Sequence, residues 1–200
     1  MKKKYILIAG VNGAGKSTLY ETIAELKVMD RINVDELVRE IGSWRNSIDV
    51  FKAGKIAVKR LEDYFTAGRS FNQETTLCGK SIIRNIEKAK QIGYLVEMHY
   101  VGVDNVDIAK QRIAYRVANG GHGIPDEDVE RRYAESFKQL KQVMEMIDLL
   151  IFYDNTEQFR RFAFYKKGKP IKLSKNIPQW FQKNIMHQKM DCSLFSTPCR

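Results

Sequence analysis

The chain has 200 residues, 29% of them charged, and a formal net charge of +10. This length suits one α/β domain that buries a sizeable core without help from disulfides, which excludes small stapled folds. No stretch approaches the roughly twenty apolar residues of a membrane span. The three cysteines, Cys78, Cys192 and Cys199, match no metal-ligand spacing, so we expect free thiols in a reducing cytoplasm.

A phosphate-binding loop follows the first predicted strand. Residues 5–9 are apolar, and residues 10–18 read GVNGAGKST, which matches the pattern G-x-x-x-x-G-K-[ST] before a helix. Lys16 is expected to reach the β- and γ-phosphates of ATP and Ser17 to offer its hydroxyl to Mg²⁺. The residues that we expect to bind the nucleotide are Gly10, Asn12, Gly13, Ala14, Gly15, Lys16, Ser17 and Thr18.

Apolar segments separated by helical patterns predict a mostly parallel five-stranded sheet covered on both faces. The predicted strands are residues 5–9, 31–34, 69–73, 94–101 and 149–153. Residues 51–67 and 77–92 are predicted helices. The carboxyl ends of the strands should hold the ligand, because the phosphate-binding loop opens there.

Two carboxylates are predicted at that edge. Asp35 directly follows the second strand, where it is either the base that deprotonates an acceptor hydroxyl or an ordinary helix N-cap. Glu74 ends the third strand and is a candidate substrate-binding or metal-binding residue, with a helix-capping carboxylate as the alternative. Thr75 beside it is a further candidate substrate contact.

A helical lid is predicted over about residues 112–140. A helix at 106–119 and a second one starting near Pro125 are joined by a glycine-rich turn that contains His122, which either touches a phosphate or caps a helix. Arg116 is a candidate phosphate clamp. At about 100° per residue, Arg132 flanks the apolar stripe of the second helix, while Arg131 lies nearly opposite it.

A small kinase is favoured over a motor ATPase. The strand at 94–101 carries Glu97 in its middle and no terminal aspartate of the kind that holds Mg²⁺ in motor ATPases. Asp104 and Asp154 lie beyond strand ends and are candidates to assist the metal. His99 is expected to be a satisfied core residue.

Residues 10–18, 33–37, 70–77, 116–125 and 129–133 together resemble the zeta-toxin family, in its short branch known as predicted ATPases. The resemblance covers residues 4–156. It implies a P-loop kinase fold, a three-layer sandwich, and ATP-dependent phosphorylation of a UDP-activated amino sugar such as UDP-N-acetylglucosamine. We also consider toxicity to the producing cell, which would imply a separate inhibitory antitoxin protein.

The resemblance assigns roles to individual positions. Lys16 and Ser17 would bind phosphate and Mg²⁺, Asp35 would be the base, and Glu74 would bind substrate. Arg116 and one arginine of the 131–132 pair would clamp phosphates. Long family members carry substrate-binding segments that this chain lacks.

The C-terminal part is strongly basic. Ten Lys or Arg residues against two acidic ones give residues 157–200 a charge of +8 and leave +2 for the first 156. We therefore predict a kinase domain at 1–156 and a basic extension at 157–200, with a hairpin turning at 167–170, a helix at 177–185 and frayed last fifteen residues. This charge keeps two alternatives open, a nucleic-acid-end kinase or RNA-directed enzyme and a solvated face of the protein. A nucleotide-switched binding module is a further alternative.

Overall fold

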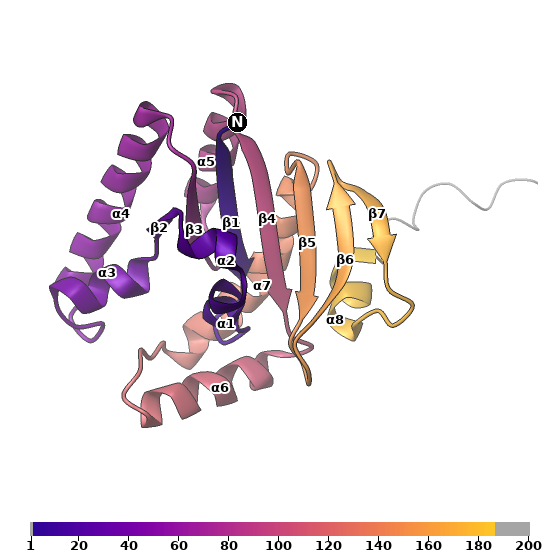
Figure 1. Cartoon of the computed structure of the whole chain (residues 1–200). Coiled ribbons are helices and arrows are strands. Elements are labelled where there is room, and N and C mark those ends of the chain that lie inside the picture. The colour runs from indigo at the N-terminus through magenta and orange to yellow at the C-terminus, as the bar shows by residue number, and fades with distance from the viewer. Residues whose placement is uncertain (1, 187–200) are drawn as a thin grey trace, which may run out of the picture.

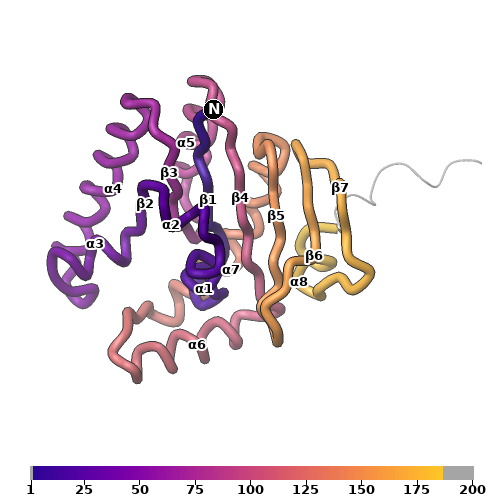
Figure 2. Tube along the Cα trace, in the orientation of Figure 1, coloured from indigo at the N-terminus to yellow at the C-terminus, as the bar shows by residue number. Residues whose placement is uncertain are grey.

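The structure is a computed structural model that describes residues 2–186 (Figures 1 and 2). Its strands are β1 (Lys4–Gly10), β2 (Asp30–Ile32), β3 (Phe71–Thr75), β4 (Leu95–Gly102), β5 (Leu149–Asp154), β6 (Arg160–Lys166) and β7 (Lys169–Leu173). Its helices are α1 (Lys16–Thr22), α2 (Ala24–Lys27), α3 (Val34–Ile41), α4 (Ser47–Ala67), α5 (Lys80–Gln91), α6 (Val106–Ala118), α7 (Asp126–Val143), α8 (Gln179–Phe181) and the π-helical turn η1 (Gln182–Met186). None of the helices in residues 2–186 is both long enough and apolar enough to cross a membrane.

One mixed sheet of seven strands runs through residues 2–186, in the order β2-β3-β1-β4-β5-β6-β7. The prediction of a five-stranded, mostly parallel sheet is wrong. The first five strands pair in parallel, but β6 pairs antiparallel with β5, and β7 pairs antiparallel with β6. The basic hairpin therefore extends the sheet, because its first strand bonds to the edge that β5 would otherwise leave open.

Alternating residues of the strands build two hydrophobic cores. In β1, Tyr5 and Leu7 pack into a core with α4, α5, α7 and α8, whereas Ile6 and Ile8 pack into a second core with α1, α2 and α6. This alternation is the consequence of a two-residue period in a strand that is buried on both faces. The result is three layers, as predicted, with helices on each side of the sheet (Figure 1).

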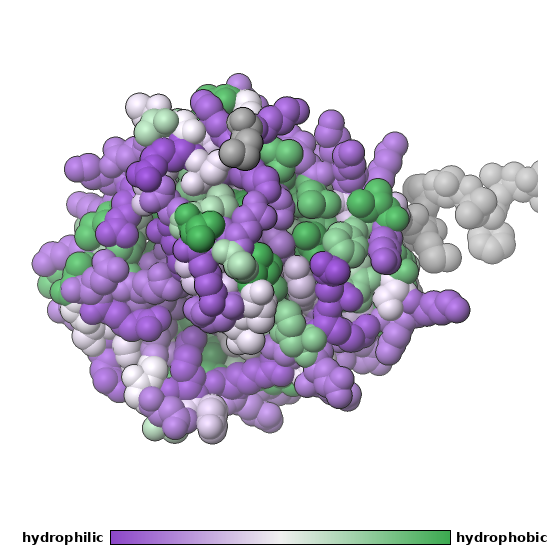
Figure 3. All heavy atoms as spheres, in the orientation of Figure 1, coloured by the Kyte–Doolittle hydropathy of each residue, from purple (hydrophilic) through white to green (hydrophobic). Residues whose placement is uncertain are grey.

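Helices cover part of the sheet face that is turned toward the viewer in Figure 1. In the view of Figures 1 and 3, α1 and α2 lie in front of the middle of the sheet and α6 crosses its lower end, while hydrophobic surface shows over the half that β5–β7 form. Most of the remaining surface in this view is hydrophilic.

Strand register places the phosphate-binding loop between two neighbours. Ala9 lies opposite Thr75 of β3, and Gly10 lies opposite Val101 of β4. A Cβ on Gly10 would stand 2.2 Å from the carbonyl oxygen of Val101, so only glycine lets the chain leave the sheet here. The loop consequently opens at the carboxyl edge of the parallel strands, where the sequence predicts the ligand.

The C-terminal hairpin turns at Lys167 and Gly168, whose φ angles are +48° and +74°. Two successive residues with positive φ suit the tight hairpin turns that match strand twist. The helix predicted at 177–185 is found as α8 and η1, and α8 buries Trp180 behind the sheet. Residues 187–200 lie outside the described part of the chain. They include all but the first of the fifteen residues predicted to be frayed, and the predicted free thiols Cys192 and Cys199.

Candidate active site

The phosphate-binding loop is shaped by glycines at its bends and by one buried cation. Gly13 and Gly15 have φ angles of +74° and +101°, a backbone conformation that glycine adopts without strain. Lys16 follows as the first residue of α1 and is only 7% exposed. Its Nζ donates a 3.1 Å hydrogen bond to the carbonyl of Val11 and lies 3.9 Å from Oε1 of Glu74. Burial lowers the pKa of Lys16, while the nearby carboxylates of Glu74 and Asp35 oppose that shift.

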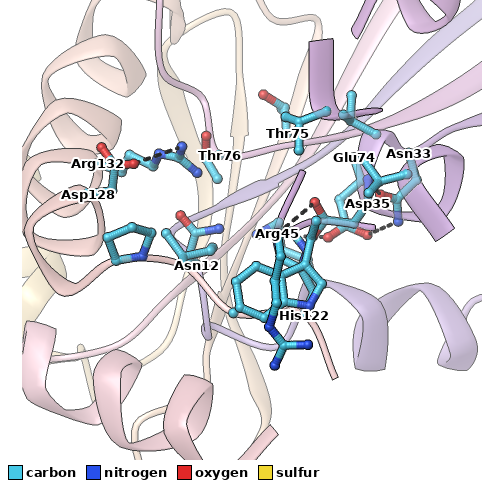
Figure 4. A pocket seen from close by; sticks show the side chains of 18 of the residues that line it. Asn12, Asn33, Asp35, Arg45, Glu74, Thr75, Thr76, His122, Asp128 and Arg132 are labelled. Atoms are coloured by element: carbon cyan, nitrogen blue, oxygen red, sulfur yellow. Dashed lines mark hydrogen bonds and ion pairs between the residues drawn. The ribbon is translucent and has the colours of Figure 1, made fainter. Parts of the chain in front are cut away.

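Two cavities meet at Lys16. A cavity of about 440 Å³ lies over the loop and is lined by Gly13, Gly15, Lys16, Ser17, Thr18, Glu74, Arg112, Ile113, Arg116 and Asn155. A second one of about 670 Å³ lies on the side of α3 (Figure 4), and Asp35, Trp44, Thr75, His122 and Arg132 are among its lining residues. Lys16 and Glu74 line both cavities. A group bound over the loop and a molecule in the larger cavity would therefore meet beside the same cation.

Asp35 lies in the first turn of α3 and not at its N-cap. The cap is Asn33, whose Oδ1 accepts a 3.0 Å hydrogen bond from the backbone N–H of Asp35. Asparagine suits this position because its short side chain reaches the free N–H groups of the first turn. The Asp35 carboxylate is thereby left to line the larger cavity, with 38% of its side chain exposed.

Glu74 belongs to β3 itself, because that strand runs to Thr75. Its Oε2 accepts hydrogen bonds of 2.9 Å from Nη2 of Arg31 and 3.1 Å from Nδ2 of Asn33. Thr75 also lines the larger cavity, and its hydroxyl oxygen accepts a hydrogen bond from the backbone of Leu77. Glu74 is thus a fixed carboxylate between two cations, Arg31 and Lys16.

The predicted lid arginines lie in different places. Arg116 lines the cavity over the loop, and its Nε donates a 2.8 Å hydrogen bond to the carbonyl of His122. Arg132 lines the larger cavity, 3.6 Å from the carboxylate of Asp128 (Figure 4). Arg131 has a side chain that is 58% exposed and pairs with Asp128 and Glu135. The orientation expected from helical spacing is the one found, with Arg132 inward and Arg131 outward.

Two polar residues that we did not single out from the sequence also line the cavity over the loop. Arg112 donates from Nη2 to the carbonyl of Thr156 at 3.1 Å, while its buried Nη1 has no hydrogen-bond partner among residues 2–186. Asn155 donates from Nδ2 to the carbonyl of Ala14 at 2.8 Å. Arg112 precedes Arg116 by one helical turn, so the i, i+4 spacing was a usable signal. Asn155 follows β5 and carries no such signal.

Asp104 and Asp154 serve the C-terminal segment and not the phosphate-binding loop. Oδ1 of Asp104 accepts a hydrogen bond from the backbone N–H of Trp180, and Oδ1 of Asp154 accepts one from its Nε1, each at 3.1 Å. Both aspartates line a separate cavity of about 480 Å³ beside α8. The suggestion that either one assists the metal is therefore not supported.

The polar residues in the middle of β4 satisfy one another. His99 is 5% exposed, with Nε2 at 2.8 Å from Glu97 and Nδ1 at 3.1 Å from the hydroxyl of Tyr153. His99 is thus the satisfied core residue that the sequence predicts.

The hydroxyl of Ser17 is one oxygen ligand at the loop, which fits a magnesium ion that is bound mainly through a nucleotide. Ser17 is exposed and lines the cavity over the loop. The described residues contain no group of three or more His, Cys, Asp or Glu side chains arranged to hold a metal. Mg²⁺ in nucleotide sites commonly keeps waters and takes few protein ligands beside the phosphates.

Comparisons with known proteins agree with this description. An uncharacterised protein from Haemophilus influenzae is 34% identical over 133 residues, which are 66% of this chain and 94% of that protein. The structure of AvrRxo1-ORF1:-ORF2 with ATP is similar over 98% of this chain and 66% of the matched chain, with a TM-score of 0.66 and 13% identity. A structure of the PezAT chromosomal toxin–antitoxin system of Streptococcus pneumoniae is similar over 80% of this chain and 70% of the matched one, with a TM-score of 0.56 and 18% identity.

A putative kinase from Chloroflexus aurantiacus is similar over 67% of this chain and 80% of its own, with a TM-score of 0.52 and 16% identity, and the matches together show a P-loop kinase-like fold. The chain spans 66% of the length of the AvrRxo1 chain that it matches. Residues 6–145, more than half of the chain, match the family model described as an AAA domain, and the chain therefore belongs to this family of P-loop proteins.

Proposed function

We propose that this protein transfers the γ-phosphoryl group of ATP·Mg²⁺ to a hydroxyl group of a small-molecule acceptor. The observation that carries the proposal is the meeting of the two cavities at Lys16 and Glu74, with Asp35 lining the larger one. A kinase needs one site for the triphosphate, one for the acceptor and a carboxylate at their junction. We take residues 1–156 as the kinase domain and 157–200 as its basic extension.

In this proposal the cavity over the loop holds the triphosphate. Lys16 binds the β- and γ-phosphates, and Arg116 and Arg112 contribute guanidinium groups that match phosphate oxygens. Gly10, Asn12, Gly13, Ala14, Gly15 and Thr18 shape the loop or line its cavities. Mg²⁺, bound through Ser17 and phosphate oxygens, would neutralise charge on the transferring group.

The larger cavity holds the acceptor in the same scheme. While Asp35 takes the proton of the acceptor hydroxyl, the oxygen of that hydroxyl bonds to the γ-phosphorus and ADP leaves. Glu74 and Thr75 bind the acceptor, and Arg132 neutralises anionic oxygens on the α7 side. Fixed charges of this kind act without reorganising during the reaction, which is how they lower the barrier.

The acceptor that we propose is UDP-N-acetylglucosamine or a related sugar nucleotide. The support is the resemblance to zeta toxins, together with a cavity whose volume of about 670 Å³ accommodates a ligand of that size. Toxicity to the producing cell and an inhibitory antitoxin protein belong to the same proposal. The likeness to a chain of the PezAT toxin–antitoxin system supports it through the fold.

Product identification tests the proposal. The protein is incubated with γ-labelled ATP and Mg²⁺ plus UDP-N-acetylglucosamine, a metabolite extract or a 5′-hydroxyl oligonucleotide. We expect one labelled small molecule, which wild type forms, Lys16→Ala does not form, and Asp35→Asn forms roughly 10²–10⁴ times more slowly. Release of labelled phosphate to water alone, unchanged by any acceptor, would favour a nucleotide-switched binding module.

A nucleic-acid-end kinase is the second candidate, because the extension is so basic. Residues 160–183 include eight Lys or Arg residues, and β7 is exposed along its whole length at the sheet edge. Labelling of the oligonucleotide end that disappears when Lys166, Lys169 and Lys172 are changed to Glu would put this candidate first. Binding that weakens steeply with salt, without labelling, would indicate only a nonspecific basic surface.

A further inference from the structure

The glycine-rich turn between α6 and α7 holds a histidine over the candidate base. Nε2 of His122 lies 3.8 Å from Oδ1 of Asp35, and the two side chains come from separate parts of the chain (Figure 4). The alternative that His122 caps a helix is wrong, because the caps of α6 and α7 beside the turn are Asn119 and Pro125. The phosphate contact stays a prediction, and the approach to Asp35 points to a further role.

The glycines on either side of His122 allow this placement. A Cβ on Gly121 would stand 2.5 Å from Cγ and 2.9 Å from the carbonyl oxygen of Arg116. A Cβ on Gly123 would stand 2.7 Å from the Trp44 ring and 2.9 Å from Val117. Such approaches are closer than real Cβ contacts allow, so the turn fits between α6 and Trp44 only because both residues are glycine.

His122 has contacts on each side of the site. Its carbonyl accepts the 2.8 Å hydrogen bond from Nε of Arg116, and its ring meets the Trp44 ring edge-on at 5.2 Å between centroids. Its Nδ1 is buried without a hydrogen-bond partner in residues 2–186. An unpaired lone pair on Nδ1 costs less than an unpaired N–H, which favours the neutral tautomer with the proton on Nε2, facing Asp35.

We propose that His122 is a positioning residue, which orients the Asp35 carboxylate toward the acceptor hydroxyl and joins it to Arg116 at the triphosphate. The proposal rests on the proposed kinase function. His122 changes no bond in the reaction, since Asp35 still takes the hydroxyl proton and ADP is still the leaving group. Its effect is geometric, because the same residue contacts an element of each cavity.

The charges around His122 predict how the contact between His122 and Asp35 responds to pH. Asp35 and Arg39 face it from α3, Arg116 from α6 and Arg132 from α7. Burial lowers the pKa of His122, the arginines add to that shift, and Asp35 opposes it. The imidazole is therefore neutral at pH 7, and it gains a proton only below its usual range. The resulting imidazolium would pair with Asp35 and weaken that carboxylate as a base. The rate of phosphoryl transfer should therefore fall as the pH drops below the pKa of His122.

Kinetics of two His122 variants test the proposal, with UDP-N-acetylglucosamine and γ-labelled ATP as the probes. We expect His122→Ala to lower kcat by about 10²-fold, the order reached by misplacing a reacting group, while KM for ATP stays within about twofold. His122→Gln keeps an N–H donor near the position of Nε2 and should recover most of kcat. Because glutamine does not titrate, the fall in rate that protonation of His122 causes at acidic pH should be absent. Tyr115→Ala, at a residue of α6 that is 75% exposed, is the matched control.

A measurement without an acceptor separates this proposal from the kinase assignment. The imidazole of His122 is titrated by NMR, with its signals assigned from the His122→Gln spectrum. Its pKa should fall in Asp35→Asn, because the opposing carboxylate is gone, and stay unchanged in Glu40→Gln, which removes another carboxylate from α3. An unchanged pKa in Asp35→Asn, or a kcat of His122→Ala equal to that of Tyr115→Ala, would overturn the role of His122. A wild type that labels no acceptor but passes the NMR test would contradict only the proposed function.

Discussion

Asn155 ties the end of β5 to the phosphate-binding loop, because its Nδ2 donates a 2.8 Å hydrogen bond to the carbonyl oxygen of Ala14. The same amide would lie 2.4 Å from a Cβ on Gly15, so loop and amide fit closely. We expect Asn155→Ala to weaken ATP binding roughly tenfold, the effect of losing one such hydrogen bond and leaving a carbonyl unpaired. Isothermal titration with ATP measures it.

The control for this variant is Asn119→Ala. Asn119 makes a comparable side-chain hydrogen bond, to the carbonyl of Tyr115, but lies at the exposed end of α6. It should bind ATP like the wild type. Equal ATP affinity in Asn155→Ala and wild type would show that the loop keeps its shape without this contact.

Gly10 and Gly54 should respond to alanine with opposite signs. Gly10→Ala places a Cβ 2.2 Å from a backbone oxygen at a φ of +142°, and we expect it to lower the free energy of unfolding by about 3 kcal/mol. Gly54 lies inside α4 with nothing within 4 Å of its added Cβ, so Gly54→Ala should raise stability by about 0.5–1 kcal/mol. Urea unfolding compares them, and a Gly10→Ala protein as stable as wild type would refute the close approach of loop and β4.

Lys16→Met should separate stability from ligand binding. Burial lowers the pKa of Lys16, which means that the folded protein holds this charge at a cost, so the ligand-free variant should unfold at an equal or higher temperature. ATP at 100 times its Kd should stabilise wild type by about 2.7 kcal/mol and Lys16→Met hardly at all. Thermal unfolding with and without ATP·Mg²⁺ measures both effects.

An exposed lysine provides the control for that experiment. Lys27→Met removes a surface charge from α2 and should keep the full ATP-dependent stabilisation. If ATP stabilised Lys16→Met as strongly as it stabilises wild type, Lys16 would not be the phosphate-binding cation.

The two neighbouring arginines of α7 should differ in their effect on transfer. Arg132→Ala is expected to lower the rate on the order of 10³-fold, as loss of a phosphate-clamping arginine does. Arg131→Ala should cost less than about tenfold, because this side chain points to solvent and its ion pairs are exposed. Single-turnover kinetics with γ-labelled ATP compares them. Equal losses, or the reverse order, would mean that α7 rotates or moves when the ligands bind.

Local patterns predicted most of the fold. Short segments between helical patterns located the first five strands within a few residues, and the glycine pattern located the phosphate-binding loop, because both signals are local in the sequence. Pairing between strands is not encoded in any one short segment. The hairpin was predicted from its turn at 167–170, but only the structure shows that its first strand pairs with β5 and makes the sheet mixed.

The sequence predicted those site residues whose charge and place after a strand or on a helix suit phosphoryl transfer. Lys16, Asp35, Glu74 and Arg132 line the two cavities as expected from their place after strands or on a helix face. The alternative that Asp35 is the N-cap of α3 is wrong. The cap is Asn33, which lies only two residues before it and is also a residue type that caps helices. Asp104 and Asp154 were misjudged because their partner, Trp180, is distant in sequence.

Product formation by Asp35→Asn decides whether this carboxylate activates the acceptor hydroxyl. Wild type and variant are compared for ATP affinity and for transfer of labelled phosphate to the acceptor under single-turnover conditions. We expect ATP affinity within a few-fold of wild type, and transfer slowed by roughly 10²–10⁴, the range for loss of a general base. Transfer at the wild-type rate, or loss of ATP binding together with transfer, would contradict the assignment of Asp35 as the base that activates the acceptor hydroxyl.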